Sequence, residues 1–218
     1  MANNNAGLGL DDLIANIAGN LSIDLPDQTL PEPDFVNYWQ LLQDRKVYLD
    51  FEITPASVMG LHRQILMLNM QDKDIPVEER KPLIVYIMSP GGDLDAMYMM
   101  TDAFAMSKTP IYTVNVGVAA SAAALVFMGG HKRFMTPTAK VLIHEGSAKL
   151  EGDAGKIMDA TDTYKQELKQ MKDYIMSRTR VPKNLLNKKR SNDWTLTAQE
   201  CLDFGICDKI IESWDEVL

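Results

Sequence analysis

The chain has 218 residues, 46% of them hydrophobic and 24% charged, which is enough to bury one sizeable core. Asp and Glu total 30 against 22 Lys and Arg, and the resulting formal charge of −8 argues against nucleic-acid binding. Cys201 and Cys207 lack metal-site spacing, so we expect buried thiols, no metal and no cofactor. With no basic segment leading into an apolar run and no membrane-spanning stretch, the sequence predicts a cytoplasmic protein without a membrane partner.

The first 34 residues differ in character from the rest of the chain. Residues 11–21 carry a short apolar pattern that fits one marginal amphipathic helix. Pro26, Pro31 and Pro33 follow, and such a series of prolines is incompatible with a continuous helix or a central strand. We therefore expect residues 1–34 to form a flexible arm or docking segment, and residues 35–218 to form one folded domain.

Two strand-and-helix pairs are predicted in the first half of this domain. Residues 47–53 alternate apolar and polar side chains, as a half-buried strand does, and Pro55 then starts a helix as its first residue. Residues 83–88 form a continuous apolar run, which is typical of a strand covered on both faces. That run stops at a Ser-Pro-Gly-Gly turn, residues 89–92, and a second helix is predicted from about 94 to 107.

The second half continues the same alternation. A strand over residues 111–116 is expected to turn at Gly117 into an Ala-rich helix over residues 119–128. Short strands are predicted at 134–135 and 141–143, and Thr197 and Glu200 fit the capping box of a last helix that ends at Gly205.

A long helix is predicted from about residue 155 to residue 177. It has one apolar stripe, which includes Tyr164 and Met171, and an otherwise charged and polar surface. Such a helix either projects from the core or packs along one side only. Together with the preceding elements, it predicts an α/β fold built from βαβ units.

Ser121 is the first candidate for chemistry. It lies among small residues near the expected start of the Ala-rich helix. The free N–H groups of a helix N-terminus stabilise a developing negative charge, and small neighbours let a substrate backbone approach. Close helix packing would select Ala and Ser equally well, so this segment alone does not establish a catalytic serine.

The Ser-Pro-Gly-Gly turn at residues 89–92 is the second candidate. Ligands of open α/β sheets bind at the carboxyl ends of strands, and glycine lets backbone amides face a ligand. Nucleotide binding is disfavoured because the chain has neither GxGxxG nor GxxxxGK[ST]. A plain tight turn would explain the same residues.

The chain has three histidines, His62, His131 and His144. His62 falls within a predicted helix and is expected at its surface or boundary, while His131 lies in a polar turn and is expected to be solvated. His144 ends a predicted strand, from which an imidazole can act as general base for a serine. A structural role for His144 remains the alternative at this point.

Together these segments resemble the ClpP peptidase family. The family's sites take the form SPGG, then GxAAS, then a strand that ends in Ile-His, and the chain has these at residues 89–92, 117–121 and 141–144. Residues 193–200 are similar to a fourth family element, Asp-x-x-Leu-Ser/Thr-Ala-x-Glu. The resemblance covers about residues 38–211, and four motifs in the right order are far more specific than any one of them.

The resemblance implies a ClpP/crotonase-like α/β fold of repeated βαβ units, with the helix over residues 155–177 as a projecting handle. Ser121 would be the nucleophile, His144 the general base, and Asp193 the carboxylate that orients the imidazole. The backbone N–H groups of Gly92 and Ala122 would bind the oxyanion. The choice of Asp193 among many acidic residues rests on the resemblance alone.

Three departures from the family pattern bear on the assembly more than on the chemistry. Glu145 and Gly146 follow the histidine where the family commonly has Gln-Pro. Ser191 and Asn192 precede Asp193 where the family often has a charged pair, ending in Arg, that helps join two rings. The N-terminal arm is also longer than the family's axial-loop segment, and unlike it.

The resemblance also implies partners. The family's working form is two stacked seven-membered rings with the sites inside a chamber, so a homo-oligomer is expected to cleave unfolded polypeptides delivered by a partner AAA+ unfoldase. A specialised phage-type maturation peptidase and a catalytically silent scaffold subunit remain alternatives. The crotonase superfamily, which shares the fold but acts on acyl-CoA thioesters, is disfavoured by the Ser–His–Asp set.

Overall fold

A computed structural model describes residues 33–146, 151–189 and 193–217. The chain divides into two units, Met1–Gln40 and Leu41–Leu218. Helix α2 (Pro33–Gln43) crosses this division, and it begins at a proline because the first helical position tolerates one. The helix expected over residues 11–21 lies outside the described residues, and the boundary after residue 34 remains a prediction.

The second unit is built on one seven-stranded sheet. Strands β1, β2, β3, β4 and β7 form a parallel path in that order, while β5 pairs with β3 on one side and antiparallel with β6 on the other. The bounds are β1 (Lys46–Leu49), β2 (Leu83–Ser89), β3 (Ile111–Ala120), β4 (Lys132–Met135), β5 (Lys140–Ile143), β6 (Trp194–Thr197) and β7 (Lys209–Ile210).

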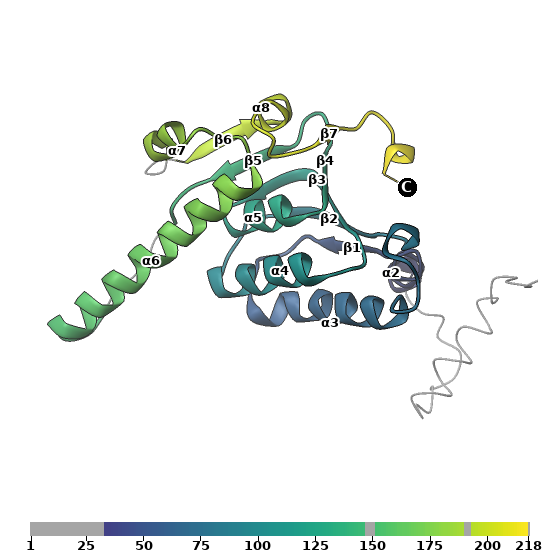
Figure 1. Ribbon diagram of the computed structural model, residues 1–218, viewed down its shortest axis with the longest axis horizontal. Coiled ribbons are helices and arrows are strands. Elements are labelled where there is room, and N and C mark those ends of the chain that lie inside the picture. Colours follow the sequence, from purple (N-terminus) through teal and green to yellow (C-terminus); the bar gives the residue numbers. More distant parts are fainter. Residues whose placement is uncertain (1–32, 147–150, 190–192, 218) are drawn as a thin grey trace, which may run out of the picture. The chain divides into compact units, whose positions relative to one another are not determined.

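Three helices lie on the same side of the sheet (Figure 1). They are α3 (Pro55–Gln71), α4 (Leu94–Met106) and α5 (Ala122–Gly129). Each connects two neighbouring parallel strands, α3 from β1 to β2, α4 from β2 to β3 and α5 from β3 to β4. The predicted α/β fold of repeated βαβ units is therefore confirmed.

The position of strand β2 in the sheet explains the continuous apolar run at residues 83–88. Leu83, Val85 and Ile87 belong to the main core beneath the helices. Ile84 and Tyr86 point to the other face, where they join a smaller apolar cluster with the C-terminal segment. Because successive side chains of a strand alternate between faces, burial of both faces explains why residues 83–87 are all apolar.

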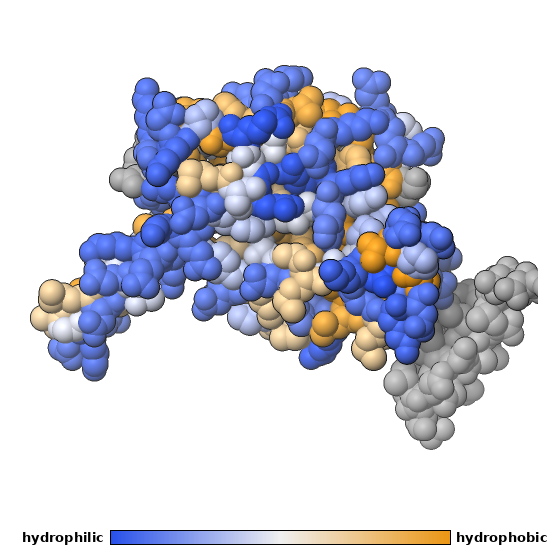
Figure 2. Space-filling view, viewed as in Figure 1, coloured by the Kyte–Doolittle hydropathy of each residue, from blue (hydrophilic) through white to orange (hydrophobic). Residues whose placement is uncertain are grey.

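Helix α6 (Ala154–Arg178) confirms the predicted long helix. It extends away from the sheet in Figure 1, and Figure 2 shows its projecting part as hydrophilic except at the free end, which is apolar. Its buried residues are Met171 and Ile175, both in the C-terminal half, where it contacts α5. The helix therefore packs along one side near its C-terminus and projects near its N-terminus.

The C-terminal part contains helices α7 (Lys183–Lys189) and α8 (Ala198–Asp203). The expected capping box of α8 is present, since the Thr197 hydroxyl accepts from the Glu200 N–H and the Glu200 carboxylate accepts from the Thr197 N–H. Two 3₁₀ turns, Val77–Glu79 and Trp214–Glu216, complete the elements. Within residues 33–146, 151–189 and 193–217, no helix combines the length and apolar character needed to cross a membrane.

The expected turn at Gly117 is wrong, because β3 continues to Ala120. Ile87 of β2 pairs with Asn115 and Ser89 pairs with Ala119, so two steps along β2 match four along β3 and the strand bulges. The buried Asn115 side chain supports the bulge by accepting from the Gly117 N–H and donating to the Lys140 carbonyl. The strand therefore bends at Gly117, and the turn into α5 falls on Ser121.

A buried ion pair fixes the opposite end of the sheet. The Arg45 guanidinium, just before β1, makes two hydrogen bonds to the Asp72 carboxylate, at 2.7 and 2.6 Å. Asp72 lies at the end of α3, is 1% exposed, and also accepts from the Thr109 hydroxyl before β3. The hydrogen bonds from Arg45, opposed by burial and helped by Thr109, hold the pKa of Asp72 below its ordinary value of 3.8.

Asp72→Asn is expected to lower the free energy of unfolding by about 3 kcal/mol, because it leaves a largely buried Arg45 without its charge partner. Since the pKa of Asp72 is depressed by folding, its contribution is complete above pH 3.8 and is lost as the pH falls through the lower folded-state pKa. Denaturant unfolding from pH 7 to pH 2 measures both effects.

Asp74→Asn is the matched control, because this carboxylate is 87% exposed and two residues away. It should change the free energy of unfolding by less than about 0.5 kcal/mol. Equal effects of the two substitutions would show that the buried pair does not stabilise the fold as described.

Candidate active site

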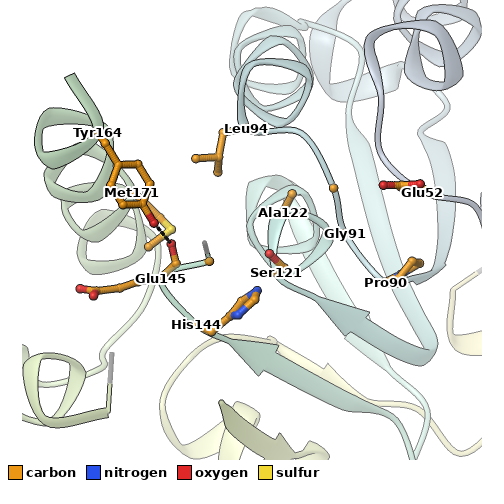
Figure 3. A pocket seen from close by; sticks show the side chains of 12 residues that line it. Glu52, Pro90, Gly91, Leu94, Ser121, Ala122, His144, Glu145, Tyr164 and Met171 are labelled. Atoms are coloured by element: carbon orange, nitrogen blue, oxygen red, sulfur yellow. Dashed lines mark hydrogen bonds between the residues drawn. The ribbon is translucent and has the colours of Figure 1, made fainter. Parts of the chain in front are cut away.

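A cavity of about 480 Å³ opens where β2, β3 and β5 end (Figure 3). Gly92 follows β2, Ser121 and Ala122 follow β3, and His144 follows β5, and all four border this cavity. Because the three strands run parallel, their carboxyl ends meet at one edge of the sheet, where ligands of such folds bind.

Ser121 forms the turn between β3 and α5. Its backbone adopts φ 54° and ψ −124°, a positive φ that non-glycine residues rarely take. Its N–H donates to the Leu142 carbonyl of β5 at 2.9 Å, and its side chain does not cap the helix. The hydroxyl instead points toward the His144 ring (Figure 3). Strained backbone of this kind gathers at functional sites, where the surrounding structure maintains it.

Burial of α5 maintains this strain. Every residue from Ala122 to Gly129 is buried, so the helix is enclosed by core on all sides. The small side chains at its start allow that enclosure, which was the structural alternative considered for the Ala-rich segment. The same small residues therefore allow the helix to pack closely and hold Ser121 in its position.

The turn after β2 requires glycine at residues 91 and 92, because neighbouring atoms lie too close to leave room for a side chain. A Cβ on Gly91 would lie 2.5 Å from the Ala120 carbonyl oxygen and 2.8 Å from the Ser121 Cβ, and one on Gly92 would collide with the Ile53 carbonyl. Their φ values, 95° and 147°, also disfavour any side chain. The turn is thus packed directly against Ser121, which a plain surface turn would not need.

Two backbone N–H groups border the cavity beside Ser121. The Ile53 carbonyl accepts from the Asp93 N–H, and the Ile53 N–H donates to the Gly91 carbonyl. These two hydrogen bonds use the backbone groups on either side of the Gly92 N–H and do not use the Gly92 N–H itself. Ile53 had been expected at the end of the first strand, but β1 stops at Leu49 and Ile53 instead pairs singly with Gly92. Ala122 is the first residue of α5, so its N–H has no acceptor within the helix.

His144 and Asp193 are placed by the pairing of β5 with β6. This antiparallel register sets Ile143 opposite Trp194, so the next residues outward are His144 and Asp193. The His144 Nδ1 lies 3.5 Å from the Asp193 Oδ1, and the two side chains are 33% and 72% exposed. The structure therefore places the His144 imidazole beside the Asp193 carboxylate and on the border of the cavity that Ser121 also lines.

The other histidines lie elsewhere. His62 is half-buried on α3, and neither it nor His131 borders the cavity. His131 is exposed as expected, although its Nδ1 accepts from the Ile111 N–H at 2.9 Å. Partial desolvation of the ring by its neighbours, followed by the nearby Arg178 charge, nevertheless lowers the pKa of His131.

Several residues that border the cavity were not singled out as site residues from the sequence. Leu94 of α4 and Met171 of α6 add apolar walls, and Tyr164 of α6 lies beside them. The apolar stripe of the long helix contained Tyr164 and Met171, so it was the available signal for this wall. Glu52 and Glu145 place carboxylates around the cavity, and no sequence pattern pointed to Glu52.

Comparison with known proteins places this fold and cavity in a family. Residues 32–214 match the model of the Clp protease family. The ATP-dependent Clp protease proteolytic subunit 2 of Treponema pallidum is 30% identical over 179 residues, which cover 81% of this chain and 87% of that protein. Proteolytic subunit 1 of Shouchella clausii is 30% identical over 80% of this chain and 88% of its own length.

A third relative, proteolytic subunit 4 of Streptomyces avermitilis, is 31% identical over 81% of this chain and 76% of its own length. The matched regions include all the strands and α3 to α8, so the similarity extends over the whole sheet and the cavity at its edge. The chain belongs to the Clp protease family.

Proposed function

We propose that the chain is a serine endopeptidase that cleaves unfolded polypeptides. The main support for this proposal is the arrangement of one cavity. It is bordered by Ser121 with its strained backbone, by His144 with Asp193 next to it, and by the N–H groups of Gly92 and Ala122. These are the nucleophile, base, orienting group and anion donors that amide hydrolysis needs.

In the proposed reaction, the Ser121 hydroxyl attacks the scissile carbonyl while His144 accepts its proton. The Nδ1 of His144 faces Asp193, so the Nε2 is the nitrogen available to Ser121. The resulting oxyanion is bound by the N–H groups of Gly92 and Ala122. His144 then gives the proton to the leaving amine, and a water molecule hydrolyses the acyl-enzyme by the reverse assignment of roles.

The assembly forms a second part of the proposal. Relatives of this chain are named as proteolytic subunits of ATP-dependent proteases. We therefore propose that the chain works in the cytoplasm as a ring-shaped homo-oligomer, with two stacked heptamers as the expected form, and receives substrates from an AAA+ unfoldase. The projecting part of α6 is suited to meeting a second copy, because its free end exposes Ile157 and Met158 and is apolar in Figure 2.

A fluorophosphonate probe tests the nucleophile. Wild-type protein is expected to be labelled covalently, and Ser121→Ala is expected to lose all labelling, because the probe reacts with an activated serine. Mass spectrometry of the labelled peptide identifies the site. Ser177→Ala, on α6 and exposed, should keep full labelling as a control. An intact oligomer that remains unlabelled would contradict the peptidase and favour a scaffold subunit.

His144→Ala is expected to lower kcat/KM for a short peptide amide by at least about 1,000-fold, because Ser121 loses its general base. Asp193→Asn should cost roughly 100- to 10,000-fold, since the imidazole loses its orienting charge. Initial rates are measured with the oligomer checked by light scattering.

His62→Ala and Asp203→Asn provide matched controls, because each removes the same chemical group away from the cavity. Both should retain wild-type rates within about twofold. Substantial turnover by His144→Ala would remove this residue from the role of base.

A further inference from the structure

The segment that carries His144 extends past the end of the sheet. Strand β5 makes its last pair with β3 at Leu142 and its last pair with β6 at Ile143. Residues 144–146 follow without regular secondary structure, and Gly146 has a positive φ of 75°. The position of the imidazole therefore depends on contacts beyond the sheet as well as on the strand.

Helix α6 provides one such contact. The Tyr164 hydroxyl donates a hydrogen bond to the Glu145 carbonyl at 3.0 Å, shown as the dashed line in Figure 3. Tyr164 comes from the projecting half of α6 and also borders the cavity. The bond joins this helix to the residue directly after His144.

The contact between His144 and Asp193 does not fix the ring by itself. Its 3.5 Å separation exceeds the 2.7–3.2 Å of a good N–H···O hydrogen bond. Asp193 is also 72% exposed, so solvent screens its charge. A partner that holds the backbone beside His144 therefore adds to the orientation that Asp193 provides.

We propose that Tyr164 is a positioning residue for His144, holding the backbone at Glu145 so that the imidazole faces Ser121 and Asp193. This inference rests on the proposed peptidase function. Tyr164 acts through the segment rather than on the reacting atoms, and it makes the geometry of the site depend on helix α6.

The donor remains available over the working pH range. Burial, followed by the charges of Glu145 and Glu167, raises the pKa of Tyr164 above its ordinary value of 10.0. The phenol therefore stays protonated in neutral and mildly alkaline solution, and its hydrogen bond to the carbonyl persists.

Tyr164→Phe removes only the hydroxyl and keeps the ring. We expect kcat for a short peptide amide to fall about five- to tenfold while KM stays within about twofold, because base catalysis is impaired and binding is not. Thermal stability and oligomeric state should match the wild type. A merely structural role would change these last two properties and leave kcat per labelled site unchanged.

Tyr98→Phe is the matched control. The Tyr98 hydroxyl of α4 also donates to a backbone carbonyl, 3.4 Å away, but this acceptor is Glu167 of α6 itself and not a residue of the segment 144–146. It should leave kcat within twofold of the wild type. An unchanged kcat in Tyr164→Phe, or an equal loss in Tyr98→Phe, would overturn the inference.

Amide hydrogen exchange supplies a readout that is independent of hydrolysis. Exchange of a peptide spanning residues 144–146 should accelerate in Tyr164→Phe and not in Tyr98→Phe, because only the first loses the tether. If the wild type proves inactive, the proposed function fails, and this exchange comparison still decides whether Tyr164 holds the segment. Equal exchange in all three proteins would show that it does not.

Discussion

The site depends on the pairing of one short strand, β5, with two neighbours at once. Its parallel register with β3 sets Ala120 beside Leu142, and its antiparallel register with β6 sets Ile143 opposite Trp194. The residues just beyond these pairs, Ser121, His144 and Asp193, are therefore brought to one place by backbone hydrogen bonds. A slip of one residue in either register would turn the following side chains to the other face.

The surrounding core stabilises these registers and the strained backbone of Ser121. Helix α5 is buried along its whole length, so the positive φ of Ser121 is enforced by packing on every side. Gly91 allows the turn after β2 to lie against Ser121 without a side chain between them. The nucleophile, the adjacent N–H groups and the apolar walls are thus consequences of one tightly packed edge of the sheet.

The spacing of apolar residues predicted the order of strands and helices well, because burial of one face or of both faces of an element determines which of its residues are apolar. It misplaced the turn after β3, since the side chain that supports the bulge, Asn115, bonds to Lys140 in another strand. Asp193 was chosen by resemblance alone, because the register between β5 and β6 decides which carboxylate meets His144. Tyr164 was visible only as one position of an apolar stripe, since its hydrogen bond joins distant elements.

The most direct test is a crystal structure of the protein after reaction with diisopropyl fluorophosphate. We expect phosphorus bonded to the Ser121 Oγ, a phosphoryl oxygen within hydrogen-bond distance of the Gly92 and Ala122 N–H groups, and His144 between Ser121 and Asp193. An adduct on another residue, or a phosphoryl oxygen directed away from both N–H groups, would contradict the proposed active site.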